Sequence, residues 1–158
     1  MKHIIRELQP EDLPFAYTIN QANVPAVGDE SEASFAELYQ LCKLALVLEL
    51  QGQIEGFCMI LSPHSSYQSP NYLYFKKQYS DFIYLDRIAL SSTVQGQGFG
   101  PLLYAAIEQR LKPTLFTLEV NIKPRNEGSL RFHLREGFKV IAEEETRPGK
   151  VVALMARS

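Results

Sequence analysis

The sequence predicts an α/β (α+β) domain in which a central sheet is flanked by helices. Strand-like and helix-like segments alternate along the 158 residues, a pattern typical of a sheet covered by helices. The segment Phe82–Leu90 is apolar on both faces except for Asp86 and Arg87, as expected of a strand inside such a sheet. The length suits one domain over residues 1–158.

The first half of the chain is expected to contribute three strands and two helices. Apolar residues at helical spacing and cap residues indicate the helices, and short apolar runs between turns indicate the strands. In chain order these are a strand at His3–Leu8, a helix opened by Pro10 that ends near Asn23–Pro25, a loop at Val24–Ser34, a helix at Ser34–Leu44, and a hairpin of Ala45–Leu50 and Ile54–Leu61.

The second half continues the alternation, so that the expected order is β-α-α-β-β-β-α-β-α-β-β. Asn126 is a typical cap for a short helix, and Gly137 a typical residue to end it. After the strand Phe82–Leu90, the expected elements are an amphipathic helix at Pro101–Leu111 with Leu102, Leu103, Ala106, Ile107 and Leu111 on its apolar face, a strand at Thr114–Ile122, a helix at Asn126–Glu136, and strands at Phe138–Ala142 and Val151–Ala156.

The segment Ser62–Asp81 is the least routine part of the sequence. Its roughly twenty residues are expected to form a loop, which is longer than most loops in compact domains. It is rich in tyrosine and phenylalanine, unlike a disordered segment, so we expect it to be packed against the domain. It forms either a satellite aromatic cluster or a wall of a substrate pocket, and for the second reading the candidate residues are Tyr72 and Tyr74.

Composition and charge exclude several classes of function. A net charge of −2 leaves no basic patch, so we expect no nucleic-acid partner. No apolar run approaches the roughly 20 residues of a membrane span, so we expect no membrane partner and a cytoplasmic protein. Cys42 and Cys58 lack metal-ligand spacing and are expected to be reduced core residues, and we expect no metal site.

A glycine-rich turn between the strand Phe82–Leu90 and the following helix predicts an anion site. Gly96, Gly98 and Gly100 leave backbone N–H groups accessible at the start of the helix, where the helix dipole is positive. The turn lacks the Lys-Ser/Thr pair of a Walker motif. Pro101 stands where a dinucleotide-binding fingerprint would need glycine.

Two motifs resemble those of the GCN5-related N-acetyltransferase (GNAT) superfamily. Gln95-x-x-Gly98-x-Gly100 is similar to the family's pyrophosphate loop, and the segment from Asn126 to Phe138 is similar to its Asn-x-x-Ala-x-x-Phe-Tyr-x-x-x-Gly-Phe helix. The resemblance implies a single N-acetyltransferase domain with the GNAT fold, whose mixed central sheet is splayed between its fourth and fifth strands. Three short segments, together with the aromatic loop, resemble an uncharacterised branch of predicted acetyltransferases: Asp86-Arg87-Ile88, Glu119-Val120-Asn121 and Phe132-His133.

The resemblance also implies acetyl-CoA as the cofactor and a set of residues that hold it. Backbone groups on the Phe82–Leu90 strand would pair with the pantetheine arm, and the glycine-rich loop would bind the pyrophosphate. Gln95 and Gln97 stand where the family commonly has Arg and Lys, so two charge-assisted contacts are missing. The cofactor-binding candidates are Ile88, Ala89, Leu90, Gln95, Gly96, Gln97, Gly98, Phe99, Gly100, Asn126 and Ser129.

Three residues are candidates for proton transfer. Tyr84 aligns with a residue that serves the family as a base and is a Glu there, so the base role cannot be carried over directly to Tyr84. Asp86 lies one pleat further along the same strand face and is the candidate base, with a structural ion pair or backbone contacts as the alternative. His133 stands where the family has a general-acid tyrosine, and its alternative is a packing histidine that hydrogen-bonds its surroundings.

The function that follows is transfer of an acetyl group from acetyl-CoA to a primary amine of a small molecule or peptide by direct attack. Glu119 and Asn121, on the strand after the central helix, join Tyr72 and Tyr74 as acceptor-binding candidates. The alternative is a non-catalytic acyl-CoA-binding or sensing protein of the same fold. The identity of the acceptor, the acyl-chain preference and the question of a homodimer stay open at this point.

Overall fold

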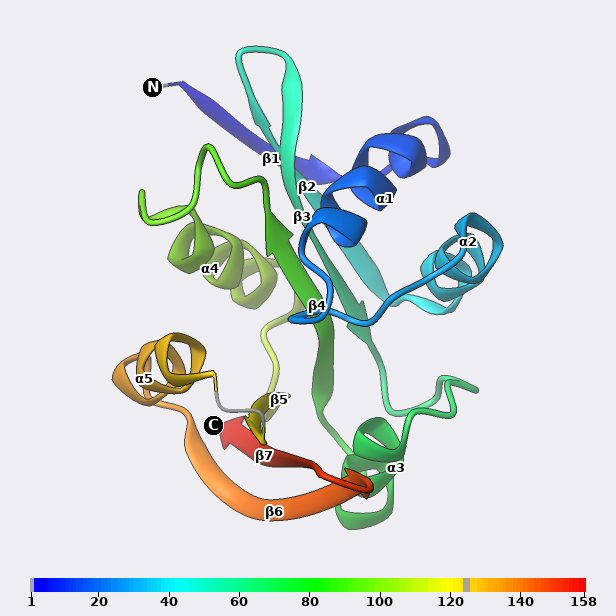
Figure 1. Ribbon diagram of the computed structural model, residues 1–158, viewed down its shortest axis with the longest axis vertical. Coiled ribbons are helices and arrows are strands. Elements are labelled where there is room, and N and C mark those ends of the chain that lie inside the picture. Colours follow the sequence, from blue (N-terminus) through cyan, green and yellow to red (C-terminus); the bar gives the residue numbers. More distant parts are fainter. Residues whose placement is uncertain (1, 124–125) are drawn as a thin grey trace. The chain divides into compact units, whose positions relative to one another are not determined.

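The computed structural model describes residues 2–123 and 126–158 (Figure 1). The expected α/β alternation is present, with one further helix, α3, inside the segment expected to be a long loop. In chain order the elements are β1 His3–Glu7, the 3-10 turn Pro10–Asp12, α1 Leu13–Ala22, α2 Glu32–Leu41, β2 Leu44–Leu50, β3 Gln53–Leu61, α3 Pro70–Gln78, β4 Ile83–Leu90, α4 Phe99–Leu111, β5 Phe116–Lys123, α5 Glu127–Arg135, β6 Lys139–Arg147 and β7 Lys150–Arg157.

The strands form a seven-stranded mixed sheet in the order β1-β2-β3-β4-β5-β7-β6. The pairs β1–β2, β2–β3, β5–β7 and β6–β7 are antiparallel. β4 and β5 are parallel, with Ile83 opposite Phe116 and Tyr84 opposite Thr117 at the beginning of both strands. This parallel pair beside antiparallel pairs in one mixed sheet confirms the fold class expected from the sequence.

The chain divides into two compact units, and one of the three boundaries along the sequence falls inside β4 between Asp86 and Arg87. The first unit contains the described residues of Met1–Leu61 and Arg87–Lys112, and the second those of Ser62–Asp86 and Pro113–Ser158. The single domain expected over residues 1–158 stays a prediction. No helix within residues 2–123 and 126–158 is long and apolar enough to cross a membrane.

The core of the first unit lies around β2, six of whose seven residues are buried. Phe35 of α2 contacts Phe57 of β3 edge-on, with ring centroids 5.5 Å apart. The expected bounds of α2 were wrong by a few residues, since the helix runs over Glu32–Leu41. Its start is set by Ser31, whose hydroxyl accepts a hydrogen bond from Ser34 N–H, a typical N-cap.

The core of the second unit is aromatic and includes α3, which corrects the expected loop at Ser62–Asp81. Tyr72 and Phe75 of α3 are buried against Tyr84, with centroids 5.6 and 5.8 Å from its ring. Pro70 at the first helical position favours the start of this helix. The expectation that this segment packs down is confirmed.

Three further expectations were wrong in detail. Leu102 was expected on the apolar face of α4 but is 40% exposed, while Tyr104 of the same helix is buried. The helix begins at Phe99, two residues before the expected start at Pro101. β6 continues beyond Ala142 to Arg147, because its partner β7 extends far enough to pair with it there.

Candidate functional site

The glycine-rich loop, residues 91–98, joins β4 to α4 in the first unit and is called here the cofactor loop. Gly98 is the N-cap of α4 with φ +87°, and Gly96 has φ +75°; side chains rarely adopt these conformations. A Cβ atom added at either glycine would meet no heavy atom within 4 Å. The first N–H groups of the helix lack intrahelical acceptors, so this open backbone is suited to an anion such as a pyrophosphate.

The apolar residues of the loop fix its position against the first unit. Val94 and Phe99 are buried together with Leu48 and Leu50 of β2. His3 contacts the edge of the Phe99 ring at a centroid distance of 5.9 Å. The loop is therefore anchored on both sides of its glycines.

The two glutamines of the loop are turned back onto its own backbone. Gln95 Nε2 donates to the carbonyl oxygen of Leu90 at 2.9 Å, and Gln97 Nε2 donates to that of Thr93 at 3.0 Å. Both side chains thus help to hold the loop. An anion at this loop would therefore be bound by backbone N–H groups.

A carboxylate from β3 also holds the start of the loop. Glu55 Oε2 accepts hydrogen bonds from the hydroxyls of Ser91, at 2.9 Å, and Thr93, at 3.1 Å. Sequence reasoning missed Glu55, because it precedes the loop by 36 residues or more and belongs to no local motif.

The cofactor candidates on β4 differ in where their backbone groups point. Ser91 N–H donates to the backbone oxygen of Glu55 on β3 at 2.8 Å. Because N–H and C=O groups alternate between the two edges of a strand, Ala89 faces β3 as Ser91 does, while Ile88 and Leu90 face the opposite edge. The backbone of Ile88 and Leu90 is therefore directed away from β3.

The second unit holds a buried tyrosine beside two carboxylates. Tyr84 lies directly opposite Thr117 in the β4–β5 pair, so Asp86 and Glu119, two residues further along each strand, share its face of the sheet. Burial raises the pKa of Tyr84 well above its usual value, and the nearby charges of Glu119 and Asp86 raise it further. Tyr84 thus keeps its proton near neutrality.

Hydrogen bonding compensates little for the burial of the Tyr84 hydroxyl. The Ser69 side chain lowers the pKa of Tyr84, but its effect is smaller than that of burial. By geometry, however, Tyr84 Oη makes no hydrogen bond within residues 2–123 and 126–158. A buried hydroxyl of this kind is costly, and such groups are often found at functional sites.

The two tyrosines of α3 proposed for the acceptor have different surroundings. Tyr72 is completely buried, and its hydroxyl hydrogen-bonds the carbonyl oxygen of Ser62 and the backbone of Ser65. These contacts support the reading of a packed aromatic cluster. Tyr74 is half-buried and contacts Phe75 edge-on at 5.7 Å.

The α5 candidates contact one another. Asn126 caps the helix, accepting a hydrogen bond from Ser129 N–H at 3.2 Å. His133 Nδ1 lies 2.7 Å from the carbonyl oxygen and 3.3 Å from the hydroxyl of Ser129. Asn126 and Ser129, expected to touch the cofactor, therefore also have local structural contacts.

His133 is buried at the end of α5, and this changes its titration. Burial is the main cause that lowers its pKa below 6.5, and Arg157 lowers it further. The contact with Ser129 and the charge of Glu136 oppose this change but are smaller in effect. His133 is therefore mostly neutral near pH 7.

The predicted site residues separate cleanly between the two units. The first unit brings together most cofactor candidates, which are Ile88, Ala89, Leu90 and the loop and helix residues Gln95, Gly96, Gln97, Gly98, Phe99 and Gly100. The second unit contains the proton-transfer and acceptor candidates with two cofactor candidates, which are Tyr72, Tyr74, Tyr84, Asp86, Glu119, Asn121, Asn126, Ser129 and His133.

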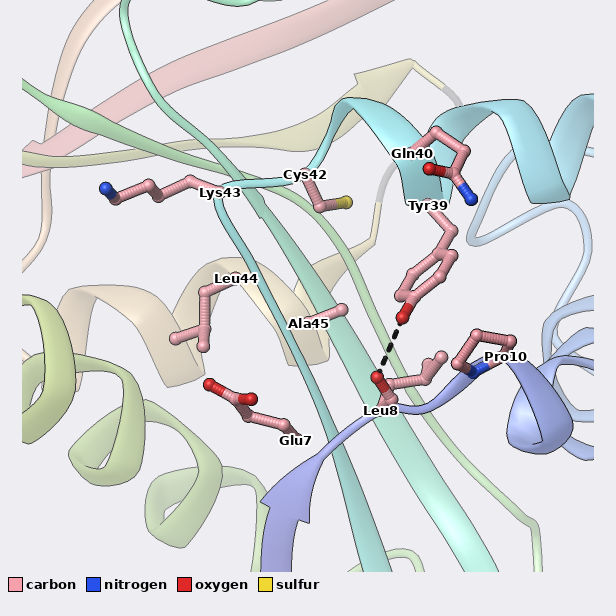
Figure 2. Close-up of a pocket in the computed structure, with 9 residues that line it drawn as sticks. All are labelled: Glu7, Leu8, Pro10, Tyr39, Gln40, Cys42, Lys43, Leu44 and Ala45. Carbon is pink, nitrogen blue, oxygen red and sulfur yellow. Dashed lines mark hydrogen bonds between the residues drawn. The ribbon is translucent and has the colours of Figure 1, made fainter.

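A pocket of about 390 Å³ lies elsewhere in the first unit, between β1, β2 and the end of α2 (Figure 2). Tyr39 Oη donates across it to the carbonyl oxygen of Leu8 at 3.0 Å. The pocket contains none of the predicted site residues.

The two cysteines differ in burial. Cys42, expected in the core, is half-buried in the wall of this pocket, whereas Cys58 is buried. Within residues 2–123 and 126–158, no cluster of acidic, histidine or cysteine side chains is suited to a metal ion.

Comparison with known proteins gives the family. The sequence model of the "Acetyltransferase (GNAT) family" matches residues 4–138, which include parts of both units. The chain therefore belongs to the GNAT acetyltransferase family. No curated protein matches the chain.

Solved structures with the same fold include N-acetyltransferases. The ribosomal-protein-S18-alanine N-acetyltransferase of Escherichia coli is 22% identical with a TM-score of 0.75, covering 98% of this chain and 92% of its own. Ard1 of Thermoplasma volcanium is 20% identical with a TM-score of 0.76, covering 99% and 97%. Naa50 of Arabidopsis thaliana, in complex with the bisubstrate analogue CoA-Ac-MVNAL, is 13% identical with a TM-score of 0.72, covering 100% and 99%. At these identities the likeness shows the fold alone.

Proposed function

We propose that the protein transfers the acetyl group of acetyl-CoA to a primary amine of a small molecule or peptide by direct attack. The observation that carries the proposal is the anchored cofactor loop, whose backbone at Gly96 and Gly98 is open for an anion. The chain's membership of the GNAT acetyltransferase family supports the same reading. So does the CoA-containing analogue bound by Naa50, a protein of the same fold.

In this proposal the first unit binds the cofactor. The N–H groups from Gln95 to Gly100 hold the pyrophosphate, as their position before and within the first turn of α4 suggests. The pantetheine arm pairs with the backbone of Ile88 and Leu90, which faces away from β3. Acetyl-CoA supplies an activated thioester. The N–H of Leu90 stabilises the negative charge that develops on the carbonyl oxygen of this thioester.

Asp86 and His133 are proposed to carry the proton transfers. Asp86 accepts a proton from the amine as the new C–N bond forms and the C–S bond breaks. His133, in its charged form, returns a proton to the departing sulfur. Tyr84 keeps its proton because its pKa is raised, so that it is suited to donate a hydrogen bond.

The acceptor amine is proposed to bind near the carboxylate face of the second unit. Glu119 and Asn121 share a strand face with each other on β5, and a carboxylate there would attract an ammonium group. Tyr74 is the more accessible aromatic candidate from α3, since Tyr72, the other candidate, is completely buried. The same proposal includes a cytoplasmic location, with no nucleic-acid or membrane partner, and a homodimer as one form of assembly.

A screen of amines tests the proposal. Acetyl-CoA is incubated with the protein and a panel that contains small amines and peptides with different first residues, and release of coenzyme A is followed by a thiol reagent. We expect at least one amine class to accelerate release, with the acetylated amine detected by mass spectrometry. Binding of acetyl-CoA in calorimetry without release for any amine would instead support a non-catalytic acyl-CoA-binding protein.

A further inference from the structure

The carbonyl oxygen of Leu90 accepts two side-chain hydrogen bonds within the first unit. Asn23 Nδ2 donates to it at 3.1 Å and Gln95 Nε2 at 2.9 Å. Gln95 Nε2 also lies 3.3 Å from Asn23 Oδ1, so the two amides contact each other as well. A carbonyl oxygen has two lone pairs, and both are used in this arrangement.

The peptide group between Leu90 and Ser91 is held at its other end too. Ser91 N–H donates to the backbone oxygen of Glu55 at 2.8 Å. This peptide group joins β4 to the cofactor loop, so its orientation determines where the N–H groups of the loop begin to point. The side chain at position 23 is therefore placed to act on the loop, although it comes from a distant part of the sequence.

Asn23 is itself fixed at the C-terminal end of α1. Its Nδ2 also donates to the carbonyl oxygen of Ile19 at 2.8 Å, and its backbone N–H donates to that of Asn20 at 3.0 Å. It is the C-cap residue of the helix. A rigid helix end thus reaches the Leu90 carbonyl, whereas Gln95 reaches it from an exposed loop.

We propose that Asn23 is a positioning residue for cofactor binding. Together with Gln95 it holds the Leu90 carbonyl, and through it the cofactor loop, in the orientation that binds the pyrophosphate. This inference rests on the proposed function. It also implies that the Leu90 carbonyl is not available to the pantetheine arm, so that pairing there uses the backbone of Ile88 and leaves the N–H of Leu90 for the thioester carbonyl.

A double-mutant cycle measured by calorimetry with coenzyme A tests this inference. Asn23→Ala and Gln95→Ala should each weaken binding about 2- to 13-fold, the range for loss of one hydrogen bond. The double variant should lose less than the product of the two effects, because either change alone breaks the shared arrangement. Multiplicative effects, or an Asn23→Ala variant that binds like the parent, would overturn the proposal.

Gln97 provides the matched control, since it lies in the same loop and its amide hydrogen-bonds Thr93 instead of Leu90. The fold-losses in coenzyme A affinity caused by Asn23→Ala and Gln97→Ala should multiply in the double variant. Unfolding temperatures are measured in parallel, because a purely structural role for Asn23 would lower them without changing the affinity of the folded variant.

The outcomes separate this inference from the function it rests on. A parent protein that does not bind coenzyme A overturns the proposed function and the positioning role with it. A parent that binds, with no coupling between Asn23 and Gln95, overturns the positioning role alone. If Asn23→Ala does not fold, the variants of the two exposed loop residues test the proposal instead. The proposal then requires Gln95→Ala to weaken coenzyme A binding more than Gln97→Ala does.

Discussion

The buried guanidinium group of Arg87 forms a salt bridge with the half-buried carboxylate of Glu30, with Nη2 and Oε2 3.3 Å apart. Arg87 Nη1 also donates to Asn20 Oδ1 at 3.0 Å and to the carbonyl oxygen of Gly28 at 3.2 Å. Its side chain is only 6% exposed. This residue of β4 therefore holds the segment between α1 and α2 in place, which explains one of the two charges in a largely apolar strand.

Replacing Arg87 by Met should destabilise the protein strongly. The change removes the Arg87 donors to Glu30 Oε2, Asn20 Oδ1 and the carbonyl oxygen of Gly28, of which the last keeps its hydrogen bond from Asn20 Nδ2. Breaking a fully buried pair costs about 3–5 kcal/mol, and the loss should lie toward the lower end because the Glu30 side chain is 21% exposed. The free energy of unfolding in urea measures the loss. Arg135→Met, at an exposed position, is the control and should stay within about 0.5 kcal/mol of the parent. A similarly small effect for Arg87→Met would show that the salt bridge contributes little.

Substitution of Gly98 by Glu should block cofactor binding. It places a negative charge where the pyrophosphate is proposed to lie, and a like-charge contact costs about 1–4 kcal/mol, or about 5- to 900-fold in affinity. Gly52→Glu is a matched control, because Gly52 has φ +79° and equally open surroundings but lies in the β2–β3 turn. Calorimetry with coenzyme A should show a loss for Gly98→Glu alone, and equal losses would contradict the proposed position.

Local patterns in the sequence predicted most of the fold, because their physical causes are local. Gly98 and Asn126 are the N-cap residues of α4 and α5, so each could be recognised from a few neighbouring residues. The helix α3 was missed because its buried residues, Asn71, Tyr72 and Phe75, give only a weak helical periodicity of apolar side chains. The full extent of β6 was missed because it depends on its pairing with β7.

The candidate site could be predicted only in part for the same reason. The cofactor loop carries a recognisable motif, whereas its anchors Asn23 and Glu55 come from other elements and carry no motif of their own. The sequence placed Tyr84 and Asp86 on one strand face. It could not show that the Tyr84 hydroxyl is completely buried, which depends on the packing of α3.

Tyr74→Ala should raise the Michaelis constant of the acceptor more than that of acetyl-CoA. Tyr74 is half-buried, so its removal should leave the fold intact. Tyr79→Ala, at the half-buried C-cap of the same helix, is the control. Tyr72→Ala is a poorer probe, because truncating a buried aromatic residue costs about 3–5 kcal/mol of stability. Equal changes in both Michaelis constants for Tyr74→Ala would leave it a packing role only.

Asp86→Asn should reduce turnover about 10²- to 10⁴-fold, the usual loss when a general base is removed. The amide keeps the size of the carboxylate and much of its hydrogen bonding, so the fold should be retained. The measurement is the rate of coenzyme A release with an amine acceptor at saturation. Asp81→Asn, at an exposed position whose carboxylate accepts from Thr114, controls for loss of a nearby charge. A folded Asp86→Asn protein with most of the parent's turnover would exclude the role.

The histidine of α5 should make stability depend on pH. Burial lowers the pKa of His133 in the folded protein, while the unfolded chain has the ordinary value of about 6.5. Above about pH 6.5 the residue is neutral in both states and has no effect. As the pH falls from 6.5 to the lower folded pKa, the unfolded state binds more protons, so stability should decrease. His133→Gln should remove this part of the pH dependence in thermal unfolding, and exposed His64→Gln should not.

The same lowered pKa sets the pH range in which His133 can act as an acid. A carbonyl oxygen only accepts, so the 2.7 Å contact with Ser129 requires the proton of the neutral ring to be on Nδ1. Only the charged ring then carries a proton on Nε2 to give to the departing sulfur. If that step limits the rate, turnover should fall as the pH rises through a pKa below 6.5.

Two substitutions of His133 separate the catalytic role from packing. His133→Tyr should keep partial activity and move the alkaline decrease upward, because the ordinary pKa of tyrosine is about 10. His133→Phe has no proton to give and should be slower by about 10²- to 10⁴-fold. The pH dependence of coenzyme A release measures both. A His133→Phe protein that turns over like the parent at every pH would show that His133 is a packing residue. Its ring centroid lies 5.5 Å from that of Phe138, and the general acid would then be another residue.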